Sequence, residues 1–211
     1  MSAPLSHLIP SRSAKRANFD PQVIYPILDE ALFCIISYSV DNKPFSIPTS
    51  FVRYEDEIFI HGSVGSHFIR QLETGIPVCI TVMLVDDLVV AKSAFSHSVN
   101  YRSVVIFSNA EIVSDYARKV ESFEWLTNKI VPGSWEYLRP IKESEVRKTT
   151  SLSFKIDQAS AKTRSGMPND EREDLELPIW SGLIPLSNKR LTPVSDPLSE
   201  NIPLPAHLKH L

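Results

Sequence analysis

The sequence has 211 residues, of which 43% are hydrophobic and 22% charged, and its formal net charge is −3. That length and balance predict one globular domain with short extensions. The small negative charge and the scattered basic residues exclude recruitment to nucleic acid or to an anionic membrane by bulk electrostatics. No apolar run approaches the ~20 residues that cross a bilayer, and no signal peptide is visible. We therefore expect a cytoplasmic protein with neither nucleic acid nor membrane as a partner.

The first third of the chain predicts a short helix and then a meander of strands. Asp20 and Pro21 are typical of a helix start, while Pro26 argues against a long helix. Cys34 and Cys79 lie within apolar runs, which predicts buried free thiols rather than a disulfide or a metal site. Strands are expected at 32–40, 45–54 and 58–61, with turns at 41–44 and 55–57.

Beyond Gly62 the pattern mixes helices with strands. Short strands with few helices favour a closed barrel, because closure hides the edges of the sheets. The prolines that follow Pro185 predict an extended tail. The expected elements are a helix over 66–73 ended by Gly75, a hairpin of 77–85 and 88–95 across Asp86-Asp87, a strand over 101–113, a helix capped by Ser114, a helical segment over 141–148 and a strand over 150–156.

The turn between the strand at 58–61 and the next helix is the strongest candidate for a binding site. Gly62 and Gly65 lie three positions apart in a chain with six glycines, and Ser63 and Ser66 add hydroxyl groups. A helix N-terminus at this position directs free amides and a positive dipole end at an anion, which favours a phosphate. The alternative is a turn that Ser66 caps with nothing bound.

Three further segments combine polar and aromatic groups. Pro48-Thr49-Ser50 places a proline within a strand, which indicates an edge or a bulge beside a site, or only a barrel corner. Tyr101 and Arg102 end a polar loop, where the arginine suits a phosphate or a ring, or is only a surface residue. Trp180 could cover an aromatic ligand or anchor the core. His61, His67 and His97 lack the spacing of a metal site, and no nucleophile motif is present, so no catalytic residue is assigned and a hydrolase is disfavoured.

Taken in order, four segments resemble the FMN-binding split-barrel proteins related to pyridoxamine 5′-phosphate oxidase, and within them the nitroimidazole-reductase-like branch. The resemblance runs from about Arg16 to Leu186 and implies a mainly β fold with peripheral helices, a six-stranded antiparallel split β-barrel that forms a homodimer with two FMN sites at its interface. It divides the chain into a flexible N-terminal segment (1–15), the barrel domain (16–186) and a Pro-containing extended tail (187–211). The segments are Phe-Ile-His-Gly-Ser-Val-Gly-Ser (59–66), Ser-Ala-Phe-Ser-His-Ser-Val-Asn-Tyr-Arg-Ser-Val-Val (93–105), Ile-Asp-Gln-Ala-Ser-Ala-Lys-Thr-Arg-Ser-Gly (156–166) and Leu-Pro-Ile-Trp-Ser-Gly-Leu-Ile-Pro-Leu (177–186).

The resemblance also implies which residues bind the cofactor. Many relatives carry a histidine where this chain has Ile35, and Lys162 and Arg164 match a basic pair to which no role is assigned. The implied contacts are Pro48, Thr49 and Ser50 at the isoalloxazine edge; His61, Gly62, Ser63, Ser66 and His67 at the ribityl chain and phosphate; Tyr101 and Arg102 near the cofactor; and Trp180 reaching the flavin from the other subunit.

Three functions remain open at this level. The first is an FMN-dependent oxidoreductase that reduces a small organic acceptor, with NADH or NADPH as the candidate donor, because the cofactor itself carries the redox chemistry. The second is a non-catalytic flavin-binding or storage protein. The third is a haem-binding split barrel that uses His61, His67 or His97 as an axial ligand.

Overall fold

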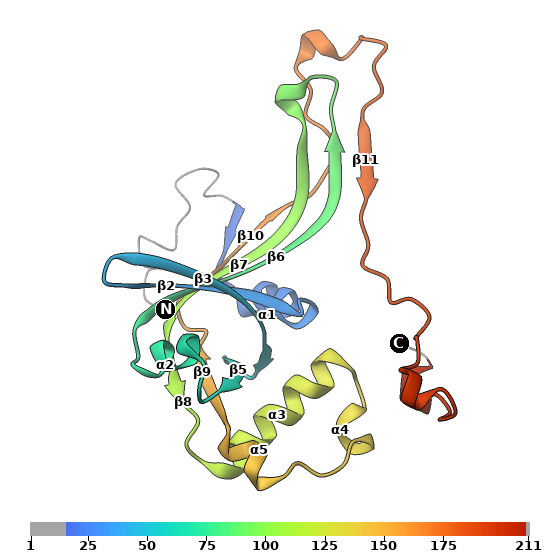
Figure 1. The fold of residues 1–211 in the computed structure, drawn as a ribbon. Coiled ribbons are helices and arrows are strands. Elements are labelled where there is room, and N and C mark those ends of the chain that lie inside the picture. Colours follow the sequence, from blue (N-terminus) through green and yellow to red (C-terminus); the bar gives the residue numbers. More distant parts are fainter. Residues whose placement is uncertain (1–15, 210–211) are drawn as a thin grey trace.

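The computed structural model describes residues 16–209, which form two antiparallel sheets with helices around them (Figure 1). The larger sheet has seven strands in the order β1-β10-β7-β6-β2-β3, with β11 paired to the outer part of β6, and the smaller has the order β4-β5-β9-β8. The prediction of a mainly β split barrel with peripheral helices is confirmed, although the described chain has eleven strands rather than six. They are β1 (Ala17–Asn18), β2 (Phe33–Val40), β3 (Lys43–Ser50), β4 (Val52–Tyr54), β5 (Glu57–Ser63), β6 (Pro77–Val90), β7 (Ser98–Asn109), β8 (Glu111–Ile112), β9 (Thr149–Lys155), β10 (Ala159–Arg164) and β11 (Gly182–Pro185).

The β2–β3 hairpin lies at one end of the larger sheet. Its two-residue turn is Asp41-Asn42, and both residues have the positive φ that such tight hairpin turns need (50° and 59°). Pro48 sits in β3, the last strand of the sheet order, as a proline within a strand requires. The fully buried Phe51 connects β3 to β4, the first strand of the second sheet.

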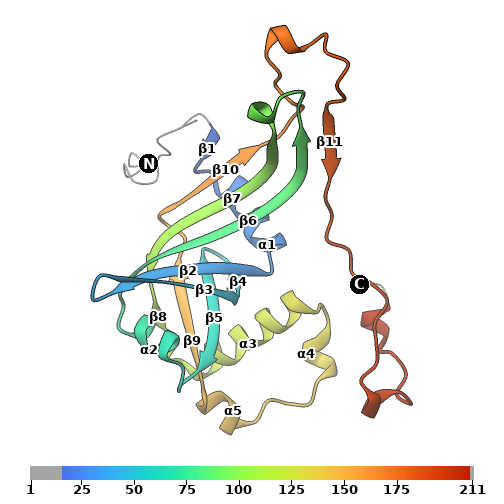
Figure 2. The same ribbon diagram turned by 45° about the horizontal axis from the view of Figure 1, so that its top comes forward.

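The predicted hairpin across Asp86-Asp87 is wrong, because β6 continues through both residues. Its register against β7 shifts between Val85 and Asp87, which is a β-bulge. The Asp86 carboxylate accepts from Arg102, and the Asp87 carboxylate accepts from Asn100 at 2.8 Å, so both acids find partners on β7 instead of forming a turn. The hairpin turn lies over 91–97 and contains the 3₁₀-helix η3 (Ala94–Ser96). The outer parts of β6 and β7 project as a long arm with β11 beside β6 (Figures 1 and 2).

The helices follow the expected capping signals, with small shifts. In α1 (Pro21–Glu30) the Asp20 side chain accepts from the Gln22 amide, and the helix continues through Pro26, although a proline cannot donate the amide bond of that turn. Burial of its apolar face against the barrel offsets that loss. Asp115, not Ser114, caps α3. The remaining helices are α2 (His67–Glu73), α3 (Tyr116–Ile130), α4 (Ser134–Tyr137), α5 (Glu143–Arg147), η4 (Arg172–Asp174), η5 (Pro197–Ser199) and η6 (Ala206–Leu208).

The barrel core is apolar, and α3 is tied to it by a lysine. Lys129 donates to the Leu28 carbonyl at 2.8 Å, and its ammonium lies 3.7 Å from the centre of the Phe51 ring. Burial lowers the pKa of Lys129 to about 8 and raises the pKa of the neighbouring Cys34 thiol to about 12. Cys34 and Cys79 are both free thiols, and Cys34 is buried, as predicted, while Cys79 is only partly buried.

The tail leaves the arm after β11 and returns toward α4 (Figure 2). It is extended apart from η5 and η6, as the prolines predict. The His207 ring packs against Tyr137 with the ring centres 5.2 Å apart. Among residues 16–209, no helix is long and apolar enough to span a bilayer.

Candidate functional site

The register of the larger sheet places several predicted site residues on one face, which we call the outer face. Residues directly opposite each other in an antiparallel ladder point to the same side of the sheet. The barrel core lies behind the other side, where Cys34, Ile36 and Ile80 are buried. The outer-face pairs are Phe33 with Ser50, Ile35 with Pro48 and Thr81, Met83 with Ser103, Val85 with Tyr101, Ser103 with Lys162 and Tyr101 with Arg164.

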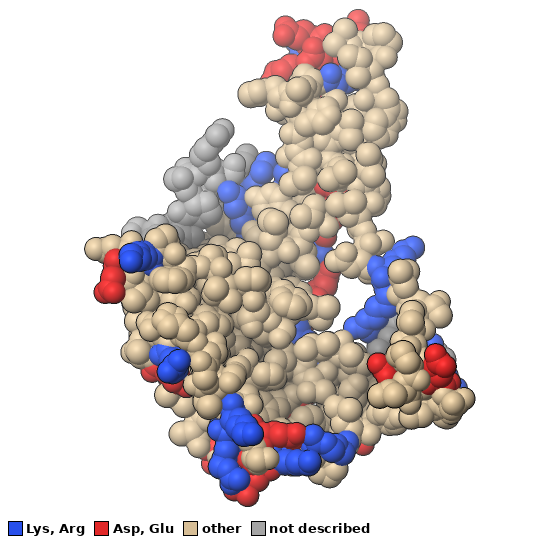
Figure 3. Space-filling model, in the orientation of Figure 1, with Lys and Arg blue, Asp and Glu red and all other residues tan. Residues whose placement is uncertain are grey.

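The outer face is unusually apolar for a surface. Phe33 is 62% exposed, Met83 64% and Ile35 45%. Much of the surface in Figure 3 carries neither acidic nor basic side chains; these gather mainly at the lower rim, at the end of the arm and over the tail. An apolar face of this kind, edged by the hydroxyl groups of Ser50 and Tyr101, is typical of a ligand or subunit contact. Ile35 lies at its centre, where relatives with histidine would present an imidazole.

Thr49 and Arg102 lie on the opposite side of the sheet. Thr49 is paired with the buried Cys34, and Arg102 with Leu84. The Arg102 guanidinium donates to Asp86 and to Glu30, and its hydrogen bonds hold the pKa of the Glu30 carboxyl below its usual value. Two carboxylates therefore neutralise Arg102 within the chain, and it joins α1 to the bulge of β6. A contact of Thr49 or Arg102 with the cofactor stays a prediction.

In the turn from Gly62 to His67, most backbone amides already donate to acceptors within the protein and are not free to bind a ligand. The amides of Val64, Gly65 and Ser66 donate to the Lys148 carbonyl, the Ser63 hydroxyl and the Ser63 carbonyl. Among the described residues no acceptor is found for the His67 and Phe68 amides at the start of α2, and the Ser66 hydroxyl accepts from the Ile69 amide at 3.5 Å. A phosphate here would meet fewer amides than the sequence suggests, so its presence stays a prediction.

The structure requires a glycine at only one of the two glycine positions in this turn. A Cβ added to Gly62 would lie 2.6 Å from Cγ1 of Ile69, whose side chain is buried. A Cβ added to Gly65 would meet only the Ser63 hydroxyl oxygen, at 3.6 Å. Gly62 is thus required by packing, whereas nothing in the described chain requires Gly65, so a close ligand or subunit would account for it.

This difference gives a matched pair of variants. Gly62→Ala is expected to lower the free energy of unfolding by about 1–3 kcal/mol through overpacking against Ile69. Gly65→Ala should stay within about 0.5 kcal/mol of the native chain. Urea denaturation of both variants measures the two values. Equal losses would contradict the packing role of Gly62.

The described histidines do not gather into one centre. The side of the His61 ring meets Phe123 edge-on with the ring centres 5.2 Å apart, and partial desolvation by its neighbours lowers its pKa. His97, on the arm, lies 2.8 Å through Nδ1 from the Ser93 carbonyl. Across residues 16–209 no group of three or more His, Cys, Asp or Glu side chains is placed to hold a metal ion.

Trp180 lies apart from the other predicted residues. It is 64% exposed and packs on Gly182, where a Cβ would come within 2.8 Å of the indole. Gly182 pairs with Val90 on the arm, whereas Tyr101 pairs with Val85. Five positions of strand separate these pairs, roughly 16 Å. One chain therefore does not bring Trp180 against the outer face.

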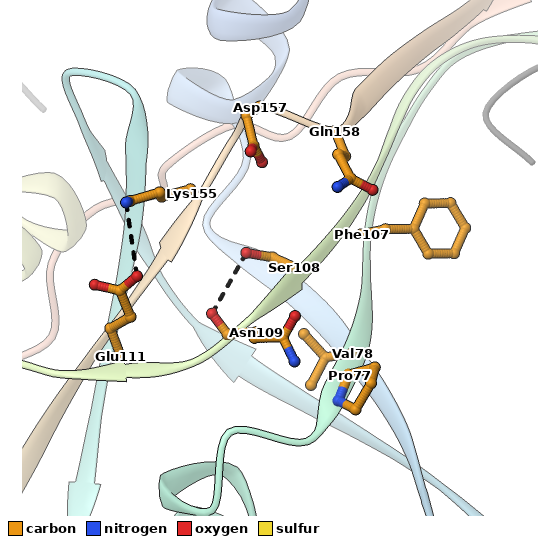
Figure 4. Close-up of a pocket in the computed structure, with 9 residues that line it drawn as sticks. All are labelled: Pro77, Val78, Phe107, Ser108, Asn109, Glu111, Lys155, Asp157 and Gln158. Atoms are coloured by element: carbon orange, nitrogen blue, oxygen red, sulfur yellow. Dashed lines mark hydrogen bonds and ion pairs between the residues drawn. The ribbon is translucent and has the colours of Figure 1, made fainter. Parts of the chain in front are cut away.

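A hollow of about 380 Å³ lies where β6 begins and where β7 and β9 end (Figure 4). Its polar groups are partly paired with each other, as in the Lys155–Glu111 ion pair at 3.7 Å. None of the predicted site residues lines it. It therefore offers no support as the cofactor site.

Sequence comparison decides the family. The model of the pyridoxamine 5′-phosphate oxidase family matches residues 20–163. The chain belongs to this family. No curated protein matches the sequence.

Solved structures of other proteins resemble this family member over different lengths. The flavocytochrome Anf3 from Azotobacter vinelandii is 34% identical, with a TM-score of 0.91 over 99% of this chain and 97% of that one. The FAD and haem binding protein from Mycobacterium smegmatis is 31% identical, with a TM-score of 0.88 over 92% and 96%. A candidate 5-nitroimidazole antibiotic resistance protein from Bacteroides thetaiotaomicron is 20% identical over 70% and 86%, with a TM-score of 0.57, and shares the fold.

Sequence reasoning missed the polar network that joins β6, β7 and β10. Asn100 is 2% exposed and links Asp87 to Arg164, and Arg16 lies beside the end of β10. The sequence singles out the basic pair Lys162 and Arg164, but Asn100, which accepts from Arg164, is 64 residues away in sequence and only the fold brings the two together.

Proposed function

We propose that this chain is a flavin- and haem-binding electron-transfer protein that works as a homodimer. One observation carries the proposal: the two proteins named for a flavin and a haem resemble this chain over 99% and 92% of its length. That span takes in the arm and most or all of the tail as well as the barrel. The nitroimidazole resistance protein covers only 70%.

The outer face fits the ring system of a flavin. Phe33, Ile35 and Met83 offer an exposed apolar surface to a flat aromatic ring, and Ser50 and Tyr101 offer hydroxyl groups beside it. Trp180 of a second subunit would cover the flavin ring, since the Trp180 of the same chain lies too far from the outer face to do so. We propose FAD as the flavin, because the M. smegmatis protein is named for FAD, in place of the FMN that the family resemblance implied.

His97 fits the needs of a haem ligand. The hydrogen bond to the Ser93 carbonyl places the proton on Nδ1, which leaves the Nε2 lone pair available to a metal. Phe95, two residues before it, is 92% exposed and offers an apolar surface beside the ligand. A haem bound there would supply one-electron chemistry, and the protein would supply the ligand and an apolar wall.

A second candidate function is a reductase of small acceptors with NADH or NADPH as the donor. The apolar character of Ile35 favours it, because an apolar wall suits a flat neutral acceptor and penalises an unpaired charge. Anaerobic mixing with NADH or NADPH tests it directly. Bleaching of the flavin followed by reoxidation with a quinone or nitroaromatic compound would support the reductase.

The visible spectrum of the purified protein tests the proposed function. We expect flavin absorption together with a Soret band, and release of a flavin with the mass of FAD. A Soret band without flavin, or flavin without a Soret band after growth with sufficient haem, would contradict the two-cofactor proposal. Release of FMN would show that only the choice of flavin is wrong.

A further inference from the structure

A second hollow, of about 450 Å³, lies between the start of β1 and the end of β10. Its lining is polar and basic, and no predicted cofactor residue belongs to it. The lining residues are Arg16, Thr163, Arg164, Ser165, Met167 and Asn169.

The hollow concentrates unneutralised positive charge in a chain whose net charge is −3. In the part of the chain that the structure describes, neither Arg16 nor Arg164 has a carboxylate within ion-pair distance, in contrast to Arg102 with its two. Two guanidinium groups beside one cavity repel each other, and an anion between them removes that cost. Guanidinium groups bind phosphate best because their planar N–H donors match its oxygen atoms in pairs.

Arg164 is held in place for such a role. Its Nη1 donates to Oδ1 of Asn100, which is buried. The Asn100 amide group donates in turn to the Asp87 carboxylate at 2.8 Å and to the Gly166 carbonyl at 3.2 Å. Both donors of Asn100 are thereby engaged, and its oxygen faces the arginine. One end of the guanidinium is fixed, and among the described residues no acceptor takes its Nε and Nη2.

We propose that this hollow binds a phosphate-class dianion between Arg16 and Arg164. The Thr163 and Ser165 hydroxyls and the Asn169 amide supply further donors at its walls. Arg164 is opposite Tyr101, so the hollow adjoins the outer face. The phosphate belongs either to the flavin nucleotide or to a separate phosphate compound. Only the first source depends on the proposed function. The positive charge of the hollow comes from Arg16 and Arg164 whether or not the protein binds a flavin.

Calorimetric titration of the full-length protein with pyrophosphate tests the hollow itself. Arg164→Met is expected to weaken binding about tenfold or more, through the loss of a charged bidentate donor. Ser165→Asp places a negative charge on an exposed loop position and should weaken binding as much with little effect on folding. Arg147→Met is the matched control, because Arg147 is equally charged and lies outside the hollow, paired with Glu143.

Titrations with FAD, FMN and riboflavin separate the two sources. Weaker binding of FAD or FMN but not of riboflavin by Arg164→Met assigns the hollow to the flavin phosphate. Weaker pyrophosphate binding with unchanged FAD and FMN binding assigns it to a separate phosphate compound. Equal pyrophosphate affinity in all four proteins, or no pyrophosphate binding together with unchanged flavin affinity in Arg164→Met, overturns the proposal. Failure of the protein to bind any flavin would leave the pyrophosphate result to decide it.

Discussion

His97→Ala is expected to remove the Soret band of the purified protein and to leave its flavin absorption in place. The Ser93 carbonyl fixes the proton of His97 on Nδ1, so that Nε2 can act only as an acceptor or a ligand. Loss of an axial nitrogen ligand removes the strongest single bond between a haem and its protein. We expect haem occupancy to fall by at least about tenfold, as for other losses at a metal site. Flavin is retained, because His97 lies on the arm and outside the outer face.

Two further histidine variants act as controls for this result. His207→Ala removes an imidazole that packs on Tyr137 at the end of the tail, and we expect an unchanged Soret band. His61→Ala tests the imidazole on β5, whose pKa is lowered by burial. A Soret band that survives in His97→Ala and disappears in His61→Ala would place the ligand on β5 instead of the arm. Unchanged spectra in both would remove both histidines from consideration.

Signals that act over a few residues allowed much of the fold to be predicted from the sequence. Asp20 and Ser66 cap their helices as expected, and Gly75 ends α2 with the positive φ of 74° that such a position takes. The same local reasoning failed at Asp86-Asp87. Two acidic residues between apolar runs indicate a turn, but here Arg102 and Asn100, 13 to 16 residues further on, satisfy both carboxylates within a continuous strand.

The strands that local reasoning missed have weak sequence signals. β10 is Ala-Ser-Ala-Lys-Thr-Arg, in which two alanines and two charged residues give little strand preference, and β11 is only four residues with a glycine and a proline. Both form because β7 and β6 offer partners across more than 50 and more than 90 residues of chain. The outer face also depends on long-range pairing. The alternation of Phe33 and Ile35 predicts that both point to one side of a strand, but only the pairing register shows that Pro48, Met83 and Tyr101 lie on the same side.

The proposed homodimer, with the outer face as its subunit contact, leads to the other large expected effect. The double variant Phe33→Glu, Met83→Glu is expected to convert the protein from a dimer to a monomer in light scattering at micromolar concentration. Both side chains are more than 60% exposed on a face whose centre is apolar, so the single chain loses little when they change. In a dimer the two charges on each subunit would be buried without partners, at a cost of several kcal/mol, which corresponds to a loss in affinity of more than about a hundredfold.

Loss of flavin should accompany this change for two reasons: Phe33 and Met83 belong to the proposed flavin surface, and dissociation removes the Trp180 of the second subunit. Trp180 lies on the arm, roughly 16 Å along the sheet from the level of Tyr101, so a single chain cannot close the indole over the outer face. Ile112→Glu is the matched control, because Ile112 is 54% exposed on β8 of the other sheet and should affect neither the dimer nor its flavin. A monomeric double variant that binds flavin at full affinity would mean that one chain completes the site and that Phe33 and Met83 do not contact the flavin. A double variant that stays dimeric would place the subunit contact elsewhere, because a face that carries four added carboxylates in the dimer cannot remain buried against its copy.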